Sequence, residues 1–248
     1  MNELEKKLKL YGIEDFQFEA KQLSVFSGKD LENALSRRLL REPLQYILGE
    51  WEFYSLPFCV GPGVLIPRAD TETLVDVALK VVKKDSRVID LCSGSGCIAI
   101  AIEKNSGCFM TALENSKDAI KYLKLNIEKN HSNIKIIQED IFKFVPNKKV
   151  DVILSNPPYI KTKDLKFLQK EVTFEPLCAL DGGEDGLLFY RRILEFIPFL
   201  NPGGHIIVEV GYDTSSDVQK LFENAGLITK AVKDLSGIDR VIFGTLAD

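Results

Sequence analysis

The sequence Asn156-Pro157-Pro158-Tyr159 combines residue types that are well suited to chemistry, and it closely follows the apolar run Val150–Leu154. Because proline has no backbone N–H, a central strand must end here, and the residue before a proline is held extended. The side-chain oxygen of Asn156 and the free backbone carbonyls can then accept hydrogen bonds beside the ring of Tyr159. Such a corner suits a planar NH2 group that donates two hydrogen bonds and stacks on the ring. An ordinary Asn-Pro-Pro turn is the alternative interpretation.

A second motif, Val-Ile-Asp-Leu-Cys-Ser-Gly-Ser-Gly-Cys, occupies residues 88–97. Gly94 and Gly96 allow a tight turn between a strand and a helix, and they let a ligand approach main-chain N–H groups. An acid lies at or just after the end of each of three successive predicted strands: Asp90, Glu114 and Asp140. These acids could bind an ammonium group, a ribose diol and an adenine amino group, respectively. Together they describe a site for an adenosine that carries a positively charged tail.

The same glycines also satisfy the dinucleotide pattern G-x-G-x-x-A, which Ala99 completes. A glycine turn that only connects a strand to a helix is a further alternative. The carboxylate of Asp90 would crowd a pyrophosphate, which favours S-adenosylmethionine (SAM) over a dinucleotide. The Asn-Pro-Pro-Tyr corner has no role in hydride transfer, so an oxidoreductase is the weaker interpretation.

Composition narrows the class of protein. The chain has 248 residues, 45% of them hydrophobic, and a formal net charge of −4 without a long basic block. This composition favours a compact domain and weakens any interpretation based on nucleic-acid binding. The five cysteines include no C-x-x-C pair and there are only two histidines, so no zinc-ligand spacing exists and we expect no metal. The charged N-terminus and the lack of a long apolar run predict a cytoplasmic protein without a membrane segment.

From residue 87 onward, predicted strands alternate with predicted helices. This order predicts a doubly wound, mostly parallel α/β sheet that binds its ligand at the carboxyl ends of the strands. The last two strands are close enough in sequence to pair as an antiparallel hairpin. The seven predicted strands are Arg87–Leu91, Phe109–Leu113, Ile134–Gln138, Val150–Leu154, His205–Val210, Ile228–Val232 and Arg240–Gly244.

The N-terminal part of the chain has a different character. Residues 1–42 have the charge and leucine spacing of helices, and Pro43 is expected to end them. Aromatic residues among glycines and prolines at 46–67 predict a β-hairpin linker. A helix with Asp70 or Thr71 as its N-cap is expected next. We therefore expect a small helical domain at 1–45, the linker at 46–67 and the α/β domain at 68–248.

These motifs resemble the HemK/PrmC family, the SAM-dependent methyltransferases that modify a glutamine of bacterial peptide-chain release factors. The glycine loop and Asn-Pro-Pro-Tyr are common to many amino-group methyltransferases and indicate the chemistry. Two other segments are more particular to the family. They are Leu-Ile-Pro-Arg-Ala-Asp-Thr-Glu at 65–72 and Ala-Leu-Asp-Gly-Gly-Glu-Asp-Gly-Leu at 179–187.

The resemblance implies a seven-stranded, Rossmann-like class I SAM-dependent methyltransferase domain. It implies methyl transfer to the side-chain nitrogen, N5, of the glutamine in the Gly-Gly-Gln motif of class 1 release factors. The N-terminal helices would dock this protein substrate, and we expect a monomer. Catalysis would fall to Asn156, Pro157 and Tyr159, with Pro158 also in contact with substrate. The cofactor would be bound by Asp90, Cys92, Ser93, Gly94, Ser95, Gly96, Glu114, Asp140, Ile141 and Asn156.

Three features depart from the family pattern. Cys92-Ser93 replaces the common Gly-Thr, Glu114 replaces a more frequent aspartate, and the N-terminal region is shorter than expected. Arg68 and Glu72 are expected near the site without an assigned role. Two rival functions remain: a methyltransferase acting on N6 of adenine or N2 of guanine in nucleic acid, and a SAM-binding regulator without activity. Base flipping usually comes with a basic surface, which this composition does not favour.

Overall fold

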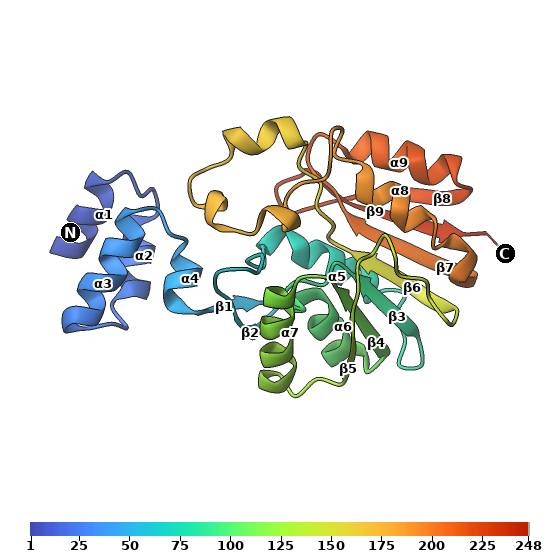
Figure 1. The fold of residues 1–248 in the computed structure, drawn as a ribbon, viewed down its shortest axis with the longest axis horizontal. Coiled ribbons are helices and arrows are strands. Elements are labelled where there is room, and N and C mark those ends of the chain that lie inside the picture. The colour runs from blue at the N-terminus through green and yellow to red at the C-terminus, as the bar shows by residue number, and fades with distance from the viewer. Residues whose placement is uncertain (248) are drawn as a thin grey trace.

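A seven-stranded sheet forms the centre of the larger part of the molecule (Figure 1). The computed structural model describes residues 1–247. The strand order is β5-β4-β3-β6-β7-β9-β8, and β9 runs in the opposite direction to the other strands of this sheet, antiparallel to β7 and β8. The doubly wound sheet with its C-terminal antiparallel hairpin is therefore confirmed. The strands are β3 (Arg87–Leu91), β4 (Phe109–Glu114), β5 (Ile134–Gln138), β6 (Val150–Ser155), β7 (Leu200–Glu209), β8 (Leu227–Lys233) and β9 (Asp239–Leu246).

The strand order reverses direction between β3 and β6. From β3 the chain adds β4 and β5 on one side, then crosses back to place β6 on the other side. In open α/β sheets, ligands bind at such a switch point, outside the carboxyl ends of the strands. The glycine motif leaves the end of β3 and Asn-Pro-Pro-Tyr leaves the end of β6. The topology therefore places both motifs at the switch point.

Helices cover both faces of the sheet, because the strands are apolar on both sides. One face packs against α5 (Glu72–Ala78), α6 (Cys97–Ser106) and α7 (Lys117–Lys129). The other packs against α8 (Leu188–Leu194) and α9 (Ser215–Asn224). Within residues 1–247, no helix combines the length and the apolar character that crossing a membrane requires.

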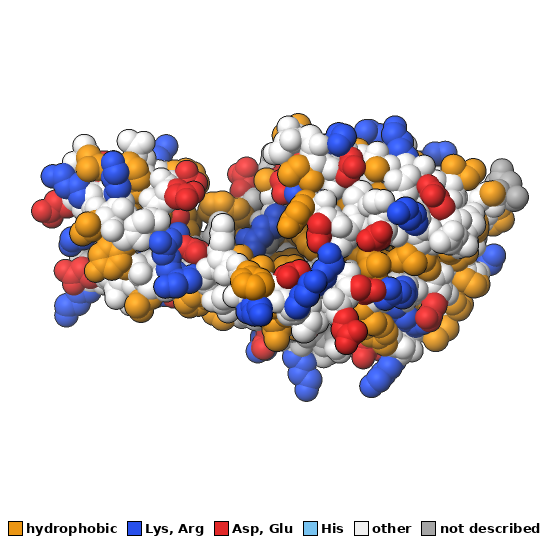
Figure 2. All heavy atoms as spheres, turned by 90° about the horizontal axis from the view of Figure 1, so that it is seen from above, with side chains coloured by type: hydrophobic (Ala, Val, Ile, Leu, Met, Phe, Trp, Pro, Cys, Tyr) orange, Lys and Arg blue, Asp and Glu red, His pale blue; other side chains and the backbone are white. Residues whose placement is uncertain are grey.

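Four helices form a separate lobe at the N-terminus, seen at the left of Figures 1 and 2. They have their own apolar core, which includes Leu8, Leu23 and Leu44. A short hairpin of β1 (Glu50–Phe53) and β2 (Leu56–Cys59) connects the lobe to the α/β part. The helices are α1 (Glu3–Leu10), α2 (Phe16–Leu23), α3 (Gly28–Leu39) and α4 (Leu44–Leu48).

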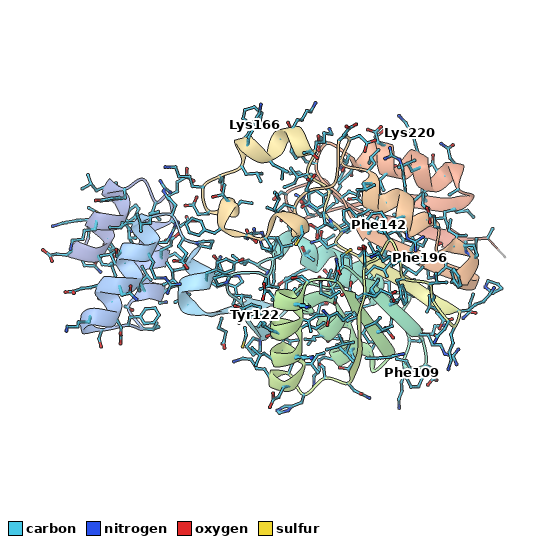
Figure 3. The ribbon with its side chains drawn as sticks, viewed as in Figure 1. Phe109, Tyr122, Phe142, Lys166, Phe196 and Lys220 are labelled. Atoms are coloured by element: carbon cyan, nitrogen blue, oxygen red, sulfur yellow. The ribbon has the colours of Figure 1, made fainter. Side chains whose placement is uncertain are left out.

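A segment of three 3-10 turns lies between the helical lobe and the sheet, and we call residues 161–187 the connecting segment (Figure 1). Its turns are η2 (Thr162–Phe167), η3 (Val172–Phe174) and η4 (Leu177–Ala179). Lys166, on η2, points away from the body of the molecule (Figure 3). Arg38 and Arg41 of the lobe pair with Glu171 of this segment at 3.1 and 3.0 Å.

The structure corrects the sequence-based expectations at three places. Pro43 does not end the helical region, because α4 follows it and includes residues 46–48. Thr71 does occupy the N-cap position of α5, one of the two predicted, but its side chain makes no capping bond and a 3-10 turn, η1 (Ala69–Thr71), precedes the helix. Asp70 instead pairs with Arg240 at 3.1 Å. The strand predicted from His205 begins at Leu200, because a bulge lets residues 200–204 continue the pairing with β6.

Candidate active site

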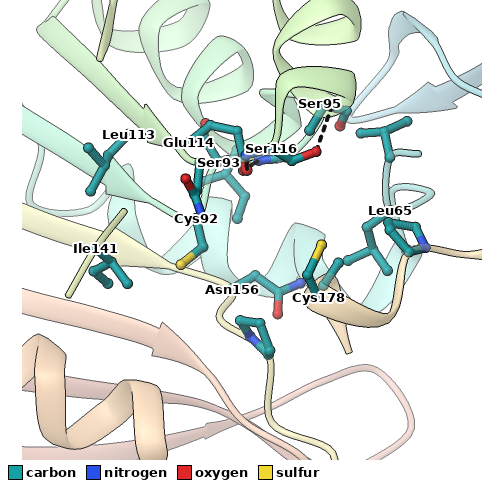
Figure 4. A pocket seen from close by; sticks show the side chains of 18 of the residues that line it. Leu65, Cys92, Ser93, Ser95, Leu113, Glu114, Ser116, Ile141, Asn156 and Cys178 are labelled. Atoms are coloured by element: carbon teal, nitrogen blue, oxygen red, sulfur yellow. Dashed lines mark hydrogen bonds between the residues drawn. The ribbon is translucent and has the colours of Figure 1, made fainter. Parts of the chain in front are cut away.

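A cavity of about 460 Å³ lies at the carboxyl ends of β3, β4 and β6 (Figure 4). Its walls include most of the residues predicted to bind a cofactor. The predicted residues that line it are Cys92, Ser93, Gly94, Ser95, Glu114, Asp140, Ile141, Asn156 and Pro158. Asp90, Gly96, Pro157 and Tyr159 lie behind this wall rather than in it. Residues 63–68 and the turn η4 complete the enclosure.

The glycine loop follows β3 and turns into α6 by three residues with positive φ. These are Cys92 (+60°), Gly94 (+56°) and Gly96 (+81°). A Cβ on Gly96 would lie 2.3 Å from the Leu123 side chain, so only glycine fits there. A Cβ on Gly94 would meet no atom within 4 Å, and the backbone is open to a ligand at this point.

Cys92 is a non-glycine residue in a left-handed conformation. Its φ of +60° costs an L-residue about 1–2 kcal/mol. This explains why glycine is common at the position in the family that the sequence resembles. The side chains of Cys92 and Cys178 both point into the cavity (Figure 4). Burial raises the pKa of both thiols, so neither is a thiolate nucleophile at neutral pH.

Asp90 is fully buried beneath the glycine loop. Its Oδ2 accepts a hydrogen bond of 2.6 Å from Ser93 Oγ, while Oδ1 has no partner among the described residues. Burial raises the pKa of Asp90 to about 7, the Ser93 hydroxyl opposes this, and the charge of Glu114 adds to it. A buried carboxylate with one free oxygen needs a cation or donor to offset its desolvation, which is the environment that a positively charged ligand would supply.

Glu114 and Asp140 occupy the rim of the cavity. Glu114 Oε2 accepts from Gly94 N at 2.8 Å and Oε1 from Ser116 N at 2.7 Å. Asp140 Oδ1 accepts from Phe142 N at 3.0 Å. These backbone donors fix both carboxylates in place. Ile141 and other apolar side chains, such as Ile98, Leu113 and Phe189, also line the cavity.

Asn156 reaches the cavity from the end of β6, and its amide is held in one orientation. Its Nδ2 donates to Thr71 Oγ1 at 3.3 Å, which leaves Oδ1 free to accept. Pro157 and Pro158 are buried, and Tyr159 is half-buried with its hydroxyl donating to Glu209 Oε1 at 3.4 Å.

The connecting segment packs directly against the backbone of the Asn-Pro-Pro-Tyr corner. A Cβ on Gly182 would lie 2.7 Å from Tyr159 Cα, and one on Gly186 would lie 2.6 Å from Tyr159 O. Ile160 also forms a parallel bridge with Asp181. The glycines at 182 and 186 are therefore needed for this close approach.

Arg68 and Glu72, expected near the site, have different positions. Arg68 lines the cavity and pairs with Glu175, whose side chain is almost fully buried. Glu175 Oε2 also accepts from Ile66 N at 2.9 Å. Glu72 lies outside the cavity and accepts from Tyr54 N at 2.8 Å. Arg68 thus connects the wall at 63–68 to the connecting segment.

Two residues beside the site, Thr71 and Glu209, were not among the predicted site residues. Thr71 lies in the Ile-Pro-Arg-Ala-Asp-Thr-Glu segment, which the sequence marked as distinctive. Glu209 ends an apolar strand, and the same signal identified Asp90 and Glu114. The acid at the end of β7 could therefore have been found from the sequence.

Comparisons with known proteins agree with the geometry. The family model "Methyltransferase small domain" matches residues 68–175. A release factor glutamine methyltransferase from Geobacter sulfurreducens is 43% identical over 216 residues, covering 86% of this chain and 76% of the relative. One from Thermodesulfovibrio yellowstonii is 42% identical over 221 residues, covering 86% and 79%. This chain belongs to the release factor glutamine methyltransferase family. The resemblance drawn from the sequence motifs is confirmed.

A solved structure also shares the fold of this release factor glutamine methyltransferase family member. A methyltransferase from Pyrococcus furiosus superposes with a TM-score of 0.62 at 19% identity, covering 88% of this chain and all of that one. At this identity the match supports the class I methyltransferase fold. Across residues 1–247 there is no group of three or more His, Cys, Asp or Glu side chains arranged to hold a metal ion.

Proposed function

We propose that this chain transfers a methyl group from SAM to N5 of the glutamine in the Gly-Gly-Gln motif of class 1 peptide-chain release factors. The main support for this proposal is the orientation of the Asn156 side-chain amide. With Nδ2 donated to Thr71, the amide presents Oδ1 as an acceptor at the end of β6, beside the cavity. An acceptor at this place suits a substrate NH2 group. Membership of the release factor glutamine methyltransferase family supports a glutamine amide as that group.

The residues of the cavity fit SAM. The free Oδ1 of Asp90 suits a cationic tail, acting from beneath Ser93, and the open backbone at Gly94 allows close approach. In this proposal the rim carboxylate of Glu114 binds the ribose. Asp140 and Ile141 contact the edge and the face of the adenine, respectively. When bound, SAM supplies an electrophilic methyl group on its sulfonium.

Asn156 and Pro157 would make the amide nitrogen reactive by position. An amide is a poor nucleophile, because its lone pair is delocalised into the carbonyl. If Asn156 Oδ1 and the Pro157 carbonyl accept its two hydrogens, the nitrogen is held facing the methyl group. During methyl transfer, positive charge would grow on the nitrogen and strengthen its hydrogen bonds to Asn156 Oδ1 and the Pro157 carbonyl. The proton then leaves to water. Tyr159 would pack against the amide plane.

The helical lobe would dock the release factor. We propose a docking domain, a hairpin linker that ends at residue 67 and a methyltransferase domain at 68–248. The boundary predicted at residue 45 moves to residue 48, because α4 (Leu44–Leu48) packs into the core of the lobe. The lobe has a separate core, and a cleft of about 850 Å³ lies between it and the connecting segment (Figure 2). Ile66 and Arg68 line both this cleft and the cavity proposed for SAM. We further propose that the protein is a monomer and that it works in the cytoplasm. The unpaired cysteines of the described chain support the cytoplasmic location.

Mass spectrometry of a purified release factor, incubated with this chain and SAM, tests the proposal. One added methyl group on the Gly-Gly-Gln glutamine, absent with Asn156→Ala, is the expected result. Parallel reactions contain DNA and ribosomal RNA. Methyl transfer to either of these, with none to the release factor, would overturn the proposed substrate and favour the nucleic-acid alternative.

A further inference from the structure

A buried glutamate, Glu209, lies directly behind the Asn-Pro-Pro-Tyr corner. It is the last residue of β7 and is 2% exposed. The Tyr159 hydroxyl donates to its Oε1 at 3.4 Å. Its Oε2 is buried and makes no hydrogen bond with the described residues. Burying an acceptor without a partner is costly, so a donor to this oxygen would stabilise the structure.

Thr71 lies between Glu209 and Asn156. It is 1% exposed, and its Oγ1 accepts from Asn156 Nδ2 at 3.3 Å. Its own hydrogen therefore remains to be donated. Its hydroxyl is close enough to Glu209 to lower the pKa of that carboxyl. Glu209 has a free acceptor, Oε2, to which Thr71 can donate this hydrogen.

The turn that carries Thr71 is fixed beside the end of β7. Asp70 pairs with Arg240 at 3.1 Å, and Arg240 also pairs with Asp234 at 3.2 Å. The backbone oxygen of Arg240 accepts from Val210 N at 2.8 Å, the residue after Glu209. This ion-paired arginine, on β9, thus anchors the η1 turn next to the buried carboxylate.

We propose that Glu209 is a positioning residue that orients two active-site side chains, Tyr159 directly and Asn156 through Thr71. An ionised carboxylate can only accept hydrogen bonds, so in a hydrogen bond between Thr71 and ionised Glu209 the Thr71 hydroxyl is the donor. The hydroxyl oxygen must then accept from Asn156, and this fixes which end of the amide faces Thr71. A flipped Asn156 amide would present NH2 to the substrate NH2, and two donors cannot bond. The ionised carboxylate of Glu209 therefore sets the donor and acceptor roles of Thr71 and, through Thr71, of Asn156. This inference rests on the proposed function in one respect, namely that the oriented Asn156 amide accepts a hydrogen bond from the substrate.

Three variants test this arrangement in the methylation assay. In Thr71→Val the shape is kept and the hydroxyl is lost, whereas Thr71→Ser keeps the hydroxyl. Glu209→Gln offers one acceptor and one donor, so it cannot accept from both hydroxyls. We expect Thr71→Val and Glu209→Gln to lower kcat by about tenfold to a hundredfold, while KM and SAM affinity stay within about threefold. Thr71→Ser should restore most of kcat, and the double variant should be little worse than either single one.

An NMR measurement tests the same inference without turnover. The side-chain NH2 signals of Asn156, assigned by their loss in Asn156→Asp, should shift as Glu209 titrates in the unmodified protein. This shift should be absent in Glu209→Gln and in Thr71→Val. The inference is wrong if the protein methylates its substrate but Thr71→Val keeps full kcat. It is also wrong if the pH-dependent shift of the Asn156 signals is unchanged in both Glu209→Gln and Thr71→Val. If the protein methylates no release factor, the proposed substrate fails, and the NMR result alone decides the role of Glu209.

Discussion

Leu91 and Ser155 are paired in register on the adjacent parallel strands β3 and β6, and the Ser155 hydroxyl donates to Leu91 O at 2.7 Å. These residues are 64 positions apart in sequence. The residue that follows β3 is Cys92, in the glycine motif, and the residue that follows β6 is Asn156, the first of Asn-Pro-Pro-Tyr. The register therefore brings the glycine loop and the Asn-Pro-Pro-Tyr corner to the same end of the sheet, where methyl donor and acceptor must meet.

Asn156→Ala should abolish measurable turnover, a loss of roughly 10²–10³-fold or more in kcat, because it removes the acceptor that holds the substrate nitrogen. SAM affinity, measured by calorimetry, should stay within about threefold, since the glycine loop and rim acids are unchanged. A substitution of Lys121, which pairs with Asp118 on the exposed face of α7, serves as the control. A variant at Asn156 with near-normal kcat would remove this residue from the mechanism.

SAM binding should weaken as pH falls below about 7. Burial raises the pKa of Asp90 to about 7, so below that pH part of the protein holds a neutral Asp90 that cannot attract a cationic tail. Binding should therefore release protons, and the affinity should level off above pH 8. Calorimetry in two buffers of different ionisation enthalpy measures the released protons. A SAM affinity independent of pH between 5.5 and 8 would show that the charge of Asp90 does not contribute to SAM binding.

The stability of the fold should depend on pH through Glu209. Burial raises its pKa from 4.5 to about 7, against the effects of Thr71, Arg240 and Tyr159. The folded state binds the Glu209 proton more tightly than the unfolded state does. The contribution of Glu209 to the free energy of unfolding is therefore complete below about pH 4.5 and is lost as pH rises through 7. Glu209→Gln lacks this loss. Relative to the unmodified protein it should gain on the order of 2 kcal/mol in unfolding free energy between pH 5 and 8.

Urea denaturation at both pH values measures that difference. The groups that face Glu209 are Tyr159, Thr71, Arg240 and Asp70, with the Tyr190 hydroxyl on its backbone oxygen. A difference that is constant from pH 5 to 8 would mean that Glu209 keeps an ordinary pKa.

Cys92→Gly should leave stability within about 1 kcal/mol, because relief of the left-handed strain offsets the added freedom of the unfolded chain. Cys92→Val should destabilise by about 2 kcal/mol or more, since a branched side chain is strongly disfavoured at a φ of +60°. Thermal and denaturant unfolding distinguish the two. Equal losses in both variants would show that packing of the thiol, rather than backbone strain, decides the residue at this position.

Arg68→Met should loosen the connecting segment. Its partner Glu175 has a side chain that is only 1% exposed and would keep just the Ile66 N–H. Arg68 is itself 39% exposed, so we expect a loss of about 1–2 kcal/mol rather than the larger cost of a fully buried pair. Trypsin should then cut faster at Lys161, Lys163, Lys166 or Lys170. Lys121→Met, which breaks an exposed pair, should leave the cleavage rate unchanged.

Local sequence determined the two chemical motifs, the alternation of strands and helices, and the family. These follow from short-range rules: prolines end a strand at Asn156, and glycines turn the chain after β3. The tertiary structure alone decided which side chains meet. Glu209 and Thr71 are far from Asn156 in sequence, and only the strand order and the anchored η1 turn place them beside it. Likewise, glycine is required at positions 182 and 186 because the connecting segment packs against the Tyr159 backbone, a contact that only the tertiary structure reveals. The physical cause is that hydrogen-bond partners across a sheet are fixed by register and topology, which no local pattern of residues contains.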